Sequence, residues 1–278
     1  MRGSAPGGTV CDMPALMKRG RIFLRGMCLL TTTPCMPRRP RVVIPGVAHH
    51  VTQRGNDRQD VFLSPADRRL YLELLAWHAG RSGSRILGYC LMTNHMHLIA
   101  VPEREQSLAR TLGRTHSEFA LAVNRANRRS GHVWQNRFFS CPMSESHLLA
   151  ALKYVELNPV RATLVANAWD WHWSSARAHV AGASPDEVLY PGWEEHLGRW
   201  DYGEWREILA AGFQTVECEA VRRATLTGEP LGPPEFVAAL ERQVGKRLRV
   251  LERGRPKKGP DSASEQVAQD CLFAASFG

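Results

Sequence analysis

Two kinds of pattern are missing from this chain, and each absence excludes a class of protein. The seven cysteines are scattered, and no two of them form a CxxC pair. An odd and unclustered set of cysteines argues against a zinc ribbon or a disulfide framework and favours free thiols in a reducing cytoplasm. The sequence also contains no run of about 18 apolar residues, so we expect no membrane-spanning helix.

Basic residues, in contrast, are in excess. Lysine and arginine number 36 against 27 aspartate and glutamate, which gives a formal net charge of +9 and a sequence pI of about 9.5. This balance favours a polyanionic partner such as nucleic acid, although a soluble protein with scattered surface charge would show it too. The chain has 278 residues, 44% of them hydrophobic, which is enough for one sizeable domain with an appendage or for two small domains.

The order of the expected elements indicates the fold class. The expected strands span 42–54, 86–89, 94–101 and 132–143, and the expected helices between and after them span 65–81, 106–129 and 144–157. Ser64, Pro65 and Asp67 supply an N-cap, a proline and an acid at the start of the first helix. The order suits an α+β fold with a ferredoxin-like antiparallel sheet and packed helices.

Both ends of the chain differ in character from its central part. Residues 1–35 are expected to form a weakly ordered extension, with Met36 as an alternative start of the protein. After about residue 200, helical stretches at 203–226 and 233–245 precede a basic segment and a polar tail. The expected domains are a main domain over 36–182, a small helical module with a basic tail over 183–260, and a disordered tail over 261–278.

Two histidines bracket one apolar residue in the strand expected at 94–101. Because successive strand residues point to opposite faces, His95 and His97 should point the same way while Met96 points into the core. Two imidazoles on one rigid strand provide half of a divalent-metal site. Pairs at this spacing also occur on inert strand surfaces, so the spacing alone leaves both interpretations open.

A tyrosine and an amide follow on the third expected helix. Tyr154 and Asn158 are four residues apart and share a helix face, so the phenol and the amide oxygen can converge on one site. A tyrosine taken alone is usually a packing residue. Asn158 also fits a helix end or kink, because Pro159 disfavours helical geometry in the residue before it. Combined with a metal and a basic chain, the pair suggests chemistry on a phosphodiester.

Basic and aromatic side chains supply candidates for contact with DNA. The arginines among them are Arg54, Arg58, Arg137 and Arg161, for which solvated surface charge is the alternative. Trp134 or Phe138 could stack a base beside a basic groove, and core packing is the alternative for both. Near the C-terminus, Arg255, Lys257 and Lys258 resemble a short minor-groove arm.

Several motifs stand in an order that resembles one family. They are His95-Met96-His97, Trp134-Gln135-Asn136-Arg137-Phe138 and the run from Tyr154 to Ala162, with Pro45-Gly46, His50–Asn56 and Trp171–Ser175 around them. Each motif is weak alone, but the ordered set over about 36–182 resembles the single-tyrosine HUH transposases. Within that superfamily, the similarity is greatest to the REP-associated tyrosine transposases, which act on single-stranded bacterial repeat DNA.

The resemblance implies an HUH nuclease-like catalytic domain and a role for each matching residue. His95 and His97 would be ligands of Mg²⁺ or Mn²⁺, with Asn158 as the third ligand. Tyr154 would attack a phosphate polarised by that metal and form a 5′-phosphotyrosine intermediate with a free 3′-hydroxyl.

The expected protein is therefore a metal-dependent single-stranded DNA endonuclease and strand-transfer transposase. The resemblance implies hairpin-forming repeats as substrate, a monomeric or homodimeric protein, and a place in the bacterial cytoplasm at the nucleoid.

Two alternatives stay open on the sequence alone. The first is a domesticated, sequence-specific DNA-binding protein on the same scaffold that binds repeats without productive cleavage. The second is a metal-dependent hydrolase of small phosphate compounds, which would not need a basic tail. The sequence contains no second cluster of carboxylates and histidines that would support the hydrolase.

Overall fold

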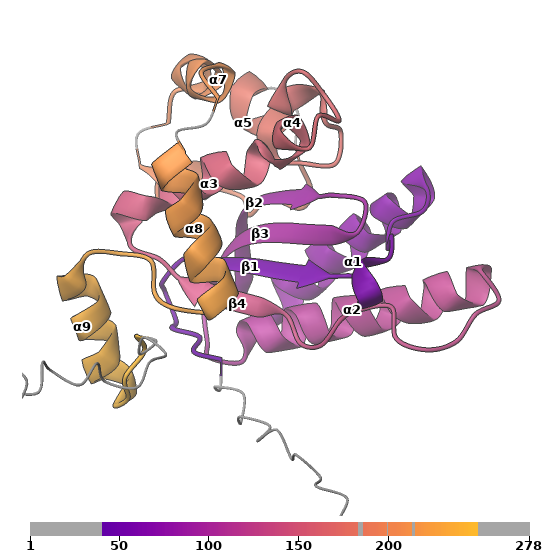
Figure 1. The fold of residues 1–278 in the computed structure, drawn as a ribbon, viewed down its shortest axis with the longest axis horizontal. Helices are drawn as coiled ribbons and strands as arrows, with labels where there is room; N and C mark the ends of the chain where they lie inside the picture. The colour runs from indigo at the N-terminus through magenta and orange to yellow at the C-terminus, as the bar shows by residue number, and fades with distance from the viewer. Residues whose placement is uncertain (1–40, 183–185, 199, 213–214, 250–278) are drawn as a thin grey trace, which may run out of the picture. The chain divides into compact units, whose positions relative to one another are not determined.

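Four strands form an antiparallel sheet in the computed structural model (Figure 1). The structure describes residues 41–182, 186–198, 200–212 and 215–249. The strands are β1 (His49–Arg54), β2 (Ser84–Leu91), β3 (His95–Pro102) and β4 (Phe139–Pro142), in the order β2-β3-β1-β4. A long helix joins β1 to β2 and another joins β3 to β4. This is the ferredoxin-like arrangement of the α+β class expected from the sequence.

Two strands are shorter than the sequence pattern indicated. The pattern at 42–54 yields only β1, because the chain first turns at Gly46, which has a φ of +77°. The pattern at 132–143 yields only β4, because the segment before it is a loop in which Asn136 has a φ of +56°. A residue in the left-handed region does not continue an extended strand, so these two predictions were too long.

α1 (Pro65–Ser82) and α2 (Ser107–Ala126) pack against each other on one face of the sheet (Figure 1). The expected cap of α1 is present: the Asp67 N–H donates to the Ser64 hydroxyl at 3.2 Å, and the Ser64 N–H donates to the Asp67 carboxylate at 2.8 Å. Each group satisfies a donor that the helix start would leave unpaired. Gly83 ends α1 with a φ of +69°, a left-handed conformation that favours glycine.

α3 (Glu145–Glu156) and α8 (Thr215–Thr227) lie over the opposite face of the sheet (Figure 1). The strand β2 passes very close to α3 at Gly88, where an added Cβ would clash with Cδ1 of Leu152. A larger residue at this position would therefore force the buried Leu152 side chain to move. The small residue therefore seats the helix that carries Tyr154 directly on the strands.

The helix α3 ends where the sequence placed a helix end or kink. Leu157 separates it from the short helix α4 (Asn158–Arg161), in which Pro159 occupies a position in the first turn. Proline is tolerated there because the N–H that it lacks would have no partner within the helix. The break redirects the chain and lets Arg161 return toward Tyr154.

Short helices follow the sheet domain. They are η2 (Ala168–Asp170), α5 (Ala176–Ala181), α6 (Trp193–Leu197), α7 (Tyr202–Ala210), α8 and α9 (Pro234–Val244); a further short helix, η1 (Asn56–Arg58), follows β1. The helix expected at 203–226 is divided into α7 and α8 near Gly212, which has a φ of +71°. The expected extension 1–35 and tail 261–278 lie outside the described residues. The expected domain boundaries therefore stay predictions.

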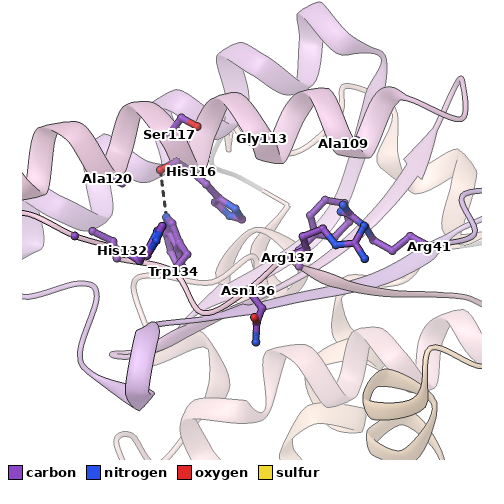
Figure 2. Close-up of a pocket in the computed structure, with 13 residues that line it drawn as sticks. Arg41, Ala109, Gly113, His116, Ser117, Ala120, His132, Trp134, Asn136 and Arg137 are labelled. Atoms are coloured by element: carbon purple, nitrogen blue, oxygen red, sulfur yellow. Dashed lines mark hydrogen bonds between the residues drawn. The ribbon is translucent and has the colours of Figure 1, made fainter. Parts of the chain in front are cut away.

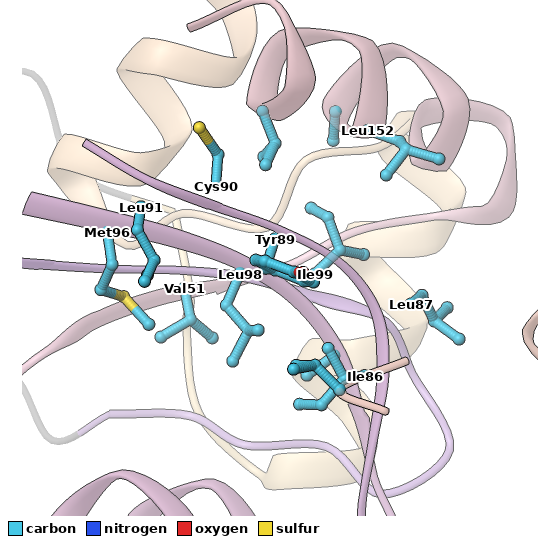
Figure 3. Packing of buried hydrophobic residues seen from close by; sticks show 14 of the residues in the cluster. Val51, Ile86, Leu87, Tyr89, Cys90, Leu91, Met96, Leu98, Ile99 and Leu152 are labelled. Atoms are coloured by element: carbon cyan, nitrogen blue, oxygen red, sulfur yellow. The ribbon is translucent and has the colours of Figure 1, made fainter. Parts of the chain in front are cut away.

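The buried side chains of the sheet form the core. Val51, Met96 and Leu98 lie together beneath β1 and β3 (Figure 3), and all three are fully buried. Met96 thus points into the core, as the alternation of the strand predicted. Burying a side chain of this size contributes about 1.5–3 kcal/mol. Among the helices in the described ranges, none combines the length and apolar character needed to cross a membrane.

A buried polar cluster fastens α3 to the helices that follow. The carboxylate of Glu156 accepts hydrogen bonds from Ser175 Oγ at 2.6 Å, from Trp205 Nε1 at 2.9 Å and from the His179 ring at 2.5 Å. The side chains of Glu156 and His179 have no solvent exposure. Because Glu156 is two residues from Tyr154, this cluster fixes the end of the helix that carries the candidate nucleophile.

Candidate active site

One face of the sheet carries histidines from two adjacent strands. In the register of β1 and β3, Arg54 lies opposite His95 and Thr52 lies opposite His97. Residues that pair across an antiparallel sheet share a face, and alternate residues of one strand also share it. His50, two residues before Thr52, therefore belongs to the same face. This is the face that α3 and α8 cover.

His95 and His97 point the same way, as their spacing predicted. Their ring centroids are 5.0 Å apart, and the rings meet edge to face. The pair is largely removed from solvent, since His97 is only 5% exposed and His95 is half-buried. Burial, together with the charges of Arg54 and Arg161, lowers the pKa of His95 to about 4. Burial also holds the pKa of His97 well below its usual value. Both rings are neutral at pH 7, which is the form that binds metals.

The tautomer of His95 follows from its neighbour Asn94. The Asn94 amide nitrogen donates to the carbonyl of Arg58 at 3.1 Å, so its oxygen faces the histidine. The Nδ1 atom of His95 lies 2.6 Å from that oxygen and must donate, because an amide oxygen only accepts. The proton of the neutral ring is therefore on Nδ1, and Nε2 keeps the lone pair that a metal would use. Asn94 directly precedes the pair in the sequence, but no spacing pattern marks it as part of the site.

Tyr154 lies beside the histidines. Its ring centroid is 5.8 Å from that of His97 and 5.9 Å from that of His50, and the residue is 6% exposed. Arg161 Nη2 donates to the phenol oxygen at 3.3 Å, and the guanidinium carbon lies 4.5 Å from the centre of the ring. The structure thus gathers a phenol, a histidine pair and an arginine in one place.

Asn158 is buried at the break between α3 and α4. Its amide nitrogen donates to the carbonyls of Tyr154 at 2.9 Å and Val155 at 3.3 Å. Asn158 therefore caps the end of the helix, which is one of the two interpretations of this residue that the sequence allowed. Its amide oxygen accepts a short hydrogen bond from Arg161. An amide oxygen has two lone pairs, so one remains for a second partner. The role of Asn158 as third metal ligand stays a prediction.

The donor atoms fit a divalent metal held by few protein ligands. Within the described ranges, no three His, Cys, Asp or Glu side chains group in a way that could hold a metal ion. The site offers two neutral imidazoles and an amide oxygen instead. Such a partial set leaves coordination positions for phosphate oxygens. Imidazole nitrogens suit a range of divalent metals, whereas Mg²⁺ prefers oxygen.

The two arginine candidates from β1 and η1 are placed differently. Arg54 is exposed at the end of β1, on the face of the histidine pair, and its charge lowers the pKa of His95. Arg58 is exposed in η1, and its backbone carbonyl holds Asn94. Both guanidinium groups are accessible to a phosphate, and their contact with DNA stays a prediction.

Trp134 and Arg137 lie on the α2 side of the sheet, away from Tyr154. They line a cavity of about 350 Å³ between α2 and the loop before β4 (Figure 2). The guanidinium of Arg41 lies 3.9 Å from the centre of the Phe138 ring in this cavity. Burial lowers the pKa of Arg41, and the charge of Arg137 lowers it further. Arginine nevertheless stays charged, so two cations share one end of the cavity.

Trp134 is a packing residue, which was one of the two interpretations that the sequence left open. Its ring is 4.5 Å from that of His116 and also packs against Phe62 and Phe119, and its Nε1 donates to the His116 carbonyl at 3.2 Å (Figure 2). Only part of the indole is exposed to the cavity. Phe138 is buried beneath Arg41. The expected basic arm, with Arg255, Lys257 and Lys258, lies outside the described residues.

The fold and the site together define a class of protein. A ferredoxin-like sheet bearing a histidine pair, with a tyrosine helix laid across it, is the arrangement implied by the resemblance to the single-tyrosine HUH transposases. Residues 44–158 match the family model described as "Transposase IS200 like". This range contains His95, His97, Tyr154 and Asn158. Residues 44–158 thus resemble the IS200-like transposases, and the expected class of enzyme, a transposase, is confirmed.

Two solved structures are similar to the chain. One is a REP-associated tyrosine transposase bound to a REP hairpin, with 21% identity and a TM-score of 0.45; the match covers 56% of this chain and 92% of the other. The second is a proposed transposase from Deinococcus radiodurans R1, with 15% identity and a TM-score of 0.31; the match covers 46% of this chain and 92% of the other. No curated protein matches the chain.

Proposed function

We propose that this transposase is a metal-dependent single-stranded DNA endonuclease and strand-transfer enzyme of the REP-associated kind. It would cut hairpin-bearing repeat DNA through a 5′-phosphotyrosine intermediate. The observation that supports this most is the position of Tyr154. Its ring lies 5.8 Å from His97, and its oxygen lies 3.3 Å from Arg161, within the domain that matches the family model.

Each residue of the site has a distinct part in this chemistry. When bound by His95, His97 and Asn158, Mg²⁺ or Mn²⁺ would supply Lewis-acid polarisation of the scissile phosphate. The Tyr154 oxygen attacks phosphorus, so a bond from tyrosine to phosphorus forms while the bond to the 3′ oxygen breaks. The phenol proton passes to solvent, and the departing 3′ oxygen takes up a proton. Arg161 places positive charge beside the attacking oxygen and the phosphate.

The energy of the phosphodiester is kept in the tyrosine–phosphate bond. A 3′-hydroxyl from another strand can therefore attack the intermediate and release the phenol, which joins the strands without a nucleotide cofactor. The buried hydrogen bonds of Glu156 at the end of α3 support this role. They hold the helix that carries Tyr154 in one position between cutting and joining.

The basic surface supplies the expected contacts with DNA. Arg54 and Arg58 lie near the histidine pair, and Arg41 and Arg137 meet at the cavity on the other face. A strand that contacts both sets would run around the end of β1, where the Gln135 N–H donates to the Arg54 carbonyl at 2.9 Å. Phosphate contacts of this kind position DNA without selecting its sequence. A monomeric or homodimeric state at the bacterial nucleoid stays part of the proposal.

A covalent-trapping assay tests the proposed function. The full chain is incubated with hairpin-bearing single-stranded DNA and Mn²⁺, and adducts are resolved on a denaturing gel. We expect an adduct with the wild type and none with Tyr154→Phe. The control Tyr190→Phe, which removes the hydroxyl of a half-buried tyrosine outside the site, should form the adduct at the wild-type level. Cleavage that continues unchanged in Tyr154→Phe would remove the nucleophile assignment.

The same assay separates the alternatives. Tight binding of the repeat strand without any adduct, in either Mg²⁺ or Mn²⁺, would favour the domesticated DNA-binding protein. Turnover of a small phosphate ester without a trapped species would favour the hydrolase.

A further inference from the structure

Thr225, on α8, holds a fixed orientation above the sheet. Its Oγ1 lies 2.7 Å from the carbonyl oxygen of Val221. Two oxygens at this distance need a proton between them, and the carbonyl has none, so the hydroxyl must donate it. In its contact with Nδ1 of His50, at 2.7 Å, the same oxygen must then be the acceptor; the buried thiol of Cys141 also contacts the Thr225 side chain. His50 therefore carries a proton on Nδ1.

The tautomer of His50 determines the tautomer of His97. The Nε2 atom of His50 lies 2.9 Å from Nδ1 of His97, and the two ring planes differ by 11°. His50 is fully buried, and burial favours the neutral ring, which has one proton. Because that proton is on Nδ1, the Nε2 atom of His50 must accept from His97. The neutral His97 ring then has its proton on Nδ1 and its lone pair on Nε2.

Both members of the histidine pair thus reach the same tautomer by separate routes. His95 is set by Asn94, which is its neighbour in the chain, whereas His97 is set from α8, far along the chain. The direction of the hydrogen bonds through Thr225 and His50 is set by the carbonyl of Val221, which can only accept. Hydrogen bonding to the non-ligating nitrogen is the usual way in which proteins orient metal-binding histidines.

Because α8 is firmly anchored, the hydrogen bonds that run from Val221 through Thr225 and His50 to His97 are held in place. Val221 and Thr225 are both buried, and α8 packs on α3, β1 and β4. After α8, the Leu231 N–H donates to the Pro142 carbonyl at 2.8 Å, and the Ser144 N–H donates to the Leu231 carbonyl at 2.9 Å. The chain on the C-terminal side of Thr225 is therefore tied to the end of β4 and the start of α3.

We infer that Thr225, acting through His50, is a positioning residue that sets the tautomer of His97 and keeps its Nε2 lone pair available for the metal. The inference rests on the proposed function for the role of His97 as a metal ligand. Through Thr225, α8 takes part in catalysis, although it lies beyond residue 158, where the match to the family model ends. The catalytic site of this chain is complete only when α8 is docked.

Two substitutions at Thr225 and a control form the test. Thr225→Val keeps the shape of the side chain but removes the acceptor, whereas Thr225→Ser keeps the hydroxyl. Thr227→Val removes the same group from an exposed site on the same helix, where the hydroxyl donates to the Arg223 carbonyl at 3.0 Å. The full chain is used throughout, and Thr225→Ala replaces Thr225→Val if the valine variant does not fold.

The first measurement is made without metal. Nitrogen-15 NMR of the imidazole rings reports which nitrogen of His97 is protonated. We expect the Nδ1–H form in the wild type, in Thr225→Ser and in Thr227→Val, and a mixture of both forms in Thr225→Val. A purely structural role for Thr225 would change the melting temperature without changing the tautomer. An unchanged His97 tautomer in Thr225→Val would overturn the inference.

The second measurement is the affinity for Mn²⁺ by calorimetry. Loss of such an orienting contact weakens metal binding by about 10- to 100-fold, so we expect a loss of about 10-fold in Thr225→Val and recovery in Thr225→Ser. Wild-type affinity in Thr225→Val would contradict the inference. If the tautomer shifts as expected but the wild-type protein binds no metal, the role of Thr225 is supported and the metal role in the proposed function fails. The two claims are thereby tested separately.

Discussion

Arg161 donates a hydrogen bond of 3.3 Å to the phenol oxygen of Tyr154 and lies with its guanidinium carbon 4.5 Å from the centre of the same ring. The arginine also donates to the amide oxygen of Asn158. One cation thus connects the candidate nucleophile with the candidate third ligand. Its charge also reaches the histidine pair, since it contributes to the lowered pKa values of His95 and His97.

Replacing Arg161 should impair catalysis more than DNA binding. Arg161→Gln removes the charge beside the attacking oxygen, and loss of one such stabilising donor typically costs about 100-fold in rate. We expect cleavage of a hairpin-bearing strand to fall by about that factor, while DNA affinity measured by fluorescence anisotropy changes less than about tenfold. Arg177→Gln, an exposed arginine on α5, is the matched control. Equal losses in cleavage and affinity would show that Arg161 only binds DNA.

Glu156→Gln should destabilise the whole domain. The wild-type carboxylate accepts from Ser175, His179 and Trp205 in a site without solvent exposure. The amide has a single acceptor oxygen and brings N–H donors that face other donors. Breaking a buried pair of this kind typically costs about 3 kcal/mol. Chemical denaturation should show that loss in Glu156→Gln and almost none in Glu207→Gln, an exposed glutamate on α7. A difference below about 1 kcal/mol would contradict the role given to this cluster.

The stability of the protein should fall as the pH drops below about 6.5. Burial lowers the pKa of His49 to about 4, while its hydrogen bonds to backbone act in the opposite direction. The unfolded chain therefore takes up a proton on this ring at a higher pH than the folded chain does. The stabilisation is fully present above the unfolded pKa and is lost as the pH falls toward 4, by about 1.4 kcal/mol per pH unit.

Denaturation curves between pH 7 and pH 4 check this prediction. His49→Asn removes the titrating ring, so its free energy of unfolding should depend less steeply on pH than that of the wild type, whatever its stability at pH 7. Identical slopes in the two proteins would show that His49 does not titrate differently in the folded and unfolded states.

Arg137→Gln should weaken DNA binding without affecting the chemistry. Arg137 is exposed and shares the cavity with Arg41, on the face of the sheet away from Tyr154. Loss of one phosphate contact lowers the slope of log affinity against log salt by about one. Binding titrations at several salt concentrations should show this change. Arg81→Gln, an exposed arginine at the end of α1, should leave the slope as it is.

The sequence predicted those parts of the site that depend on local periodicity. The spacing of His95 and His97 placed both rings on one face, and Met96 is buried as expected. The same reasoning placed the helix break beside Asn158, because Pro159 acts on its immediate neighbour. These features follow from the period of a strand and the chemistry of proline, which a single sequence shows directly.

The remaining parts depend on contacts between distant segments. His50 meets His97 only because β1 and β3 pair in one particular register, and Thr225 reaches His50 only after α8 docks. No local pattern marks either contact. Likewise, the contact of Arg161 with Tyr154 depends on how the chain turns at Leu157. The residues of the loop before β4 favour strands and predict one there, but the left-handed Asn136 interrupts it.

The proposed function requires Tyr154 to form a covalent bond with the 5′ phosphate of the cut strand. The most direct test is mass spectrometry of peptides from the wild-type protein after incubation with a hairpin-bearing strand and Mn²⁺, with separate isotopic labels on the two sides of the cut. We expect one modified peptide, with nucleotides from the 3′ side of the cut attached through a 5′ phosphate to Tyr154. A nucleotide on another residue, or complete cleavage with no modified peptide, would contradict it.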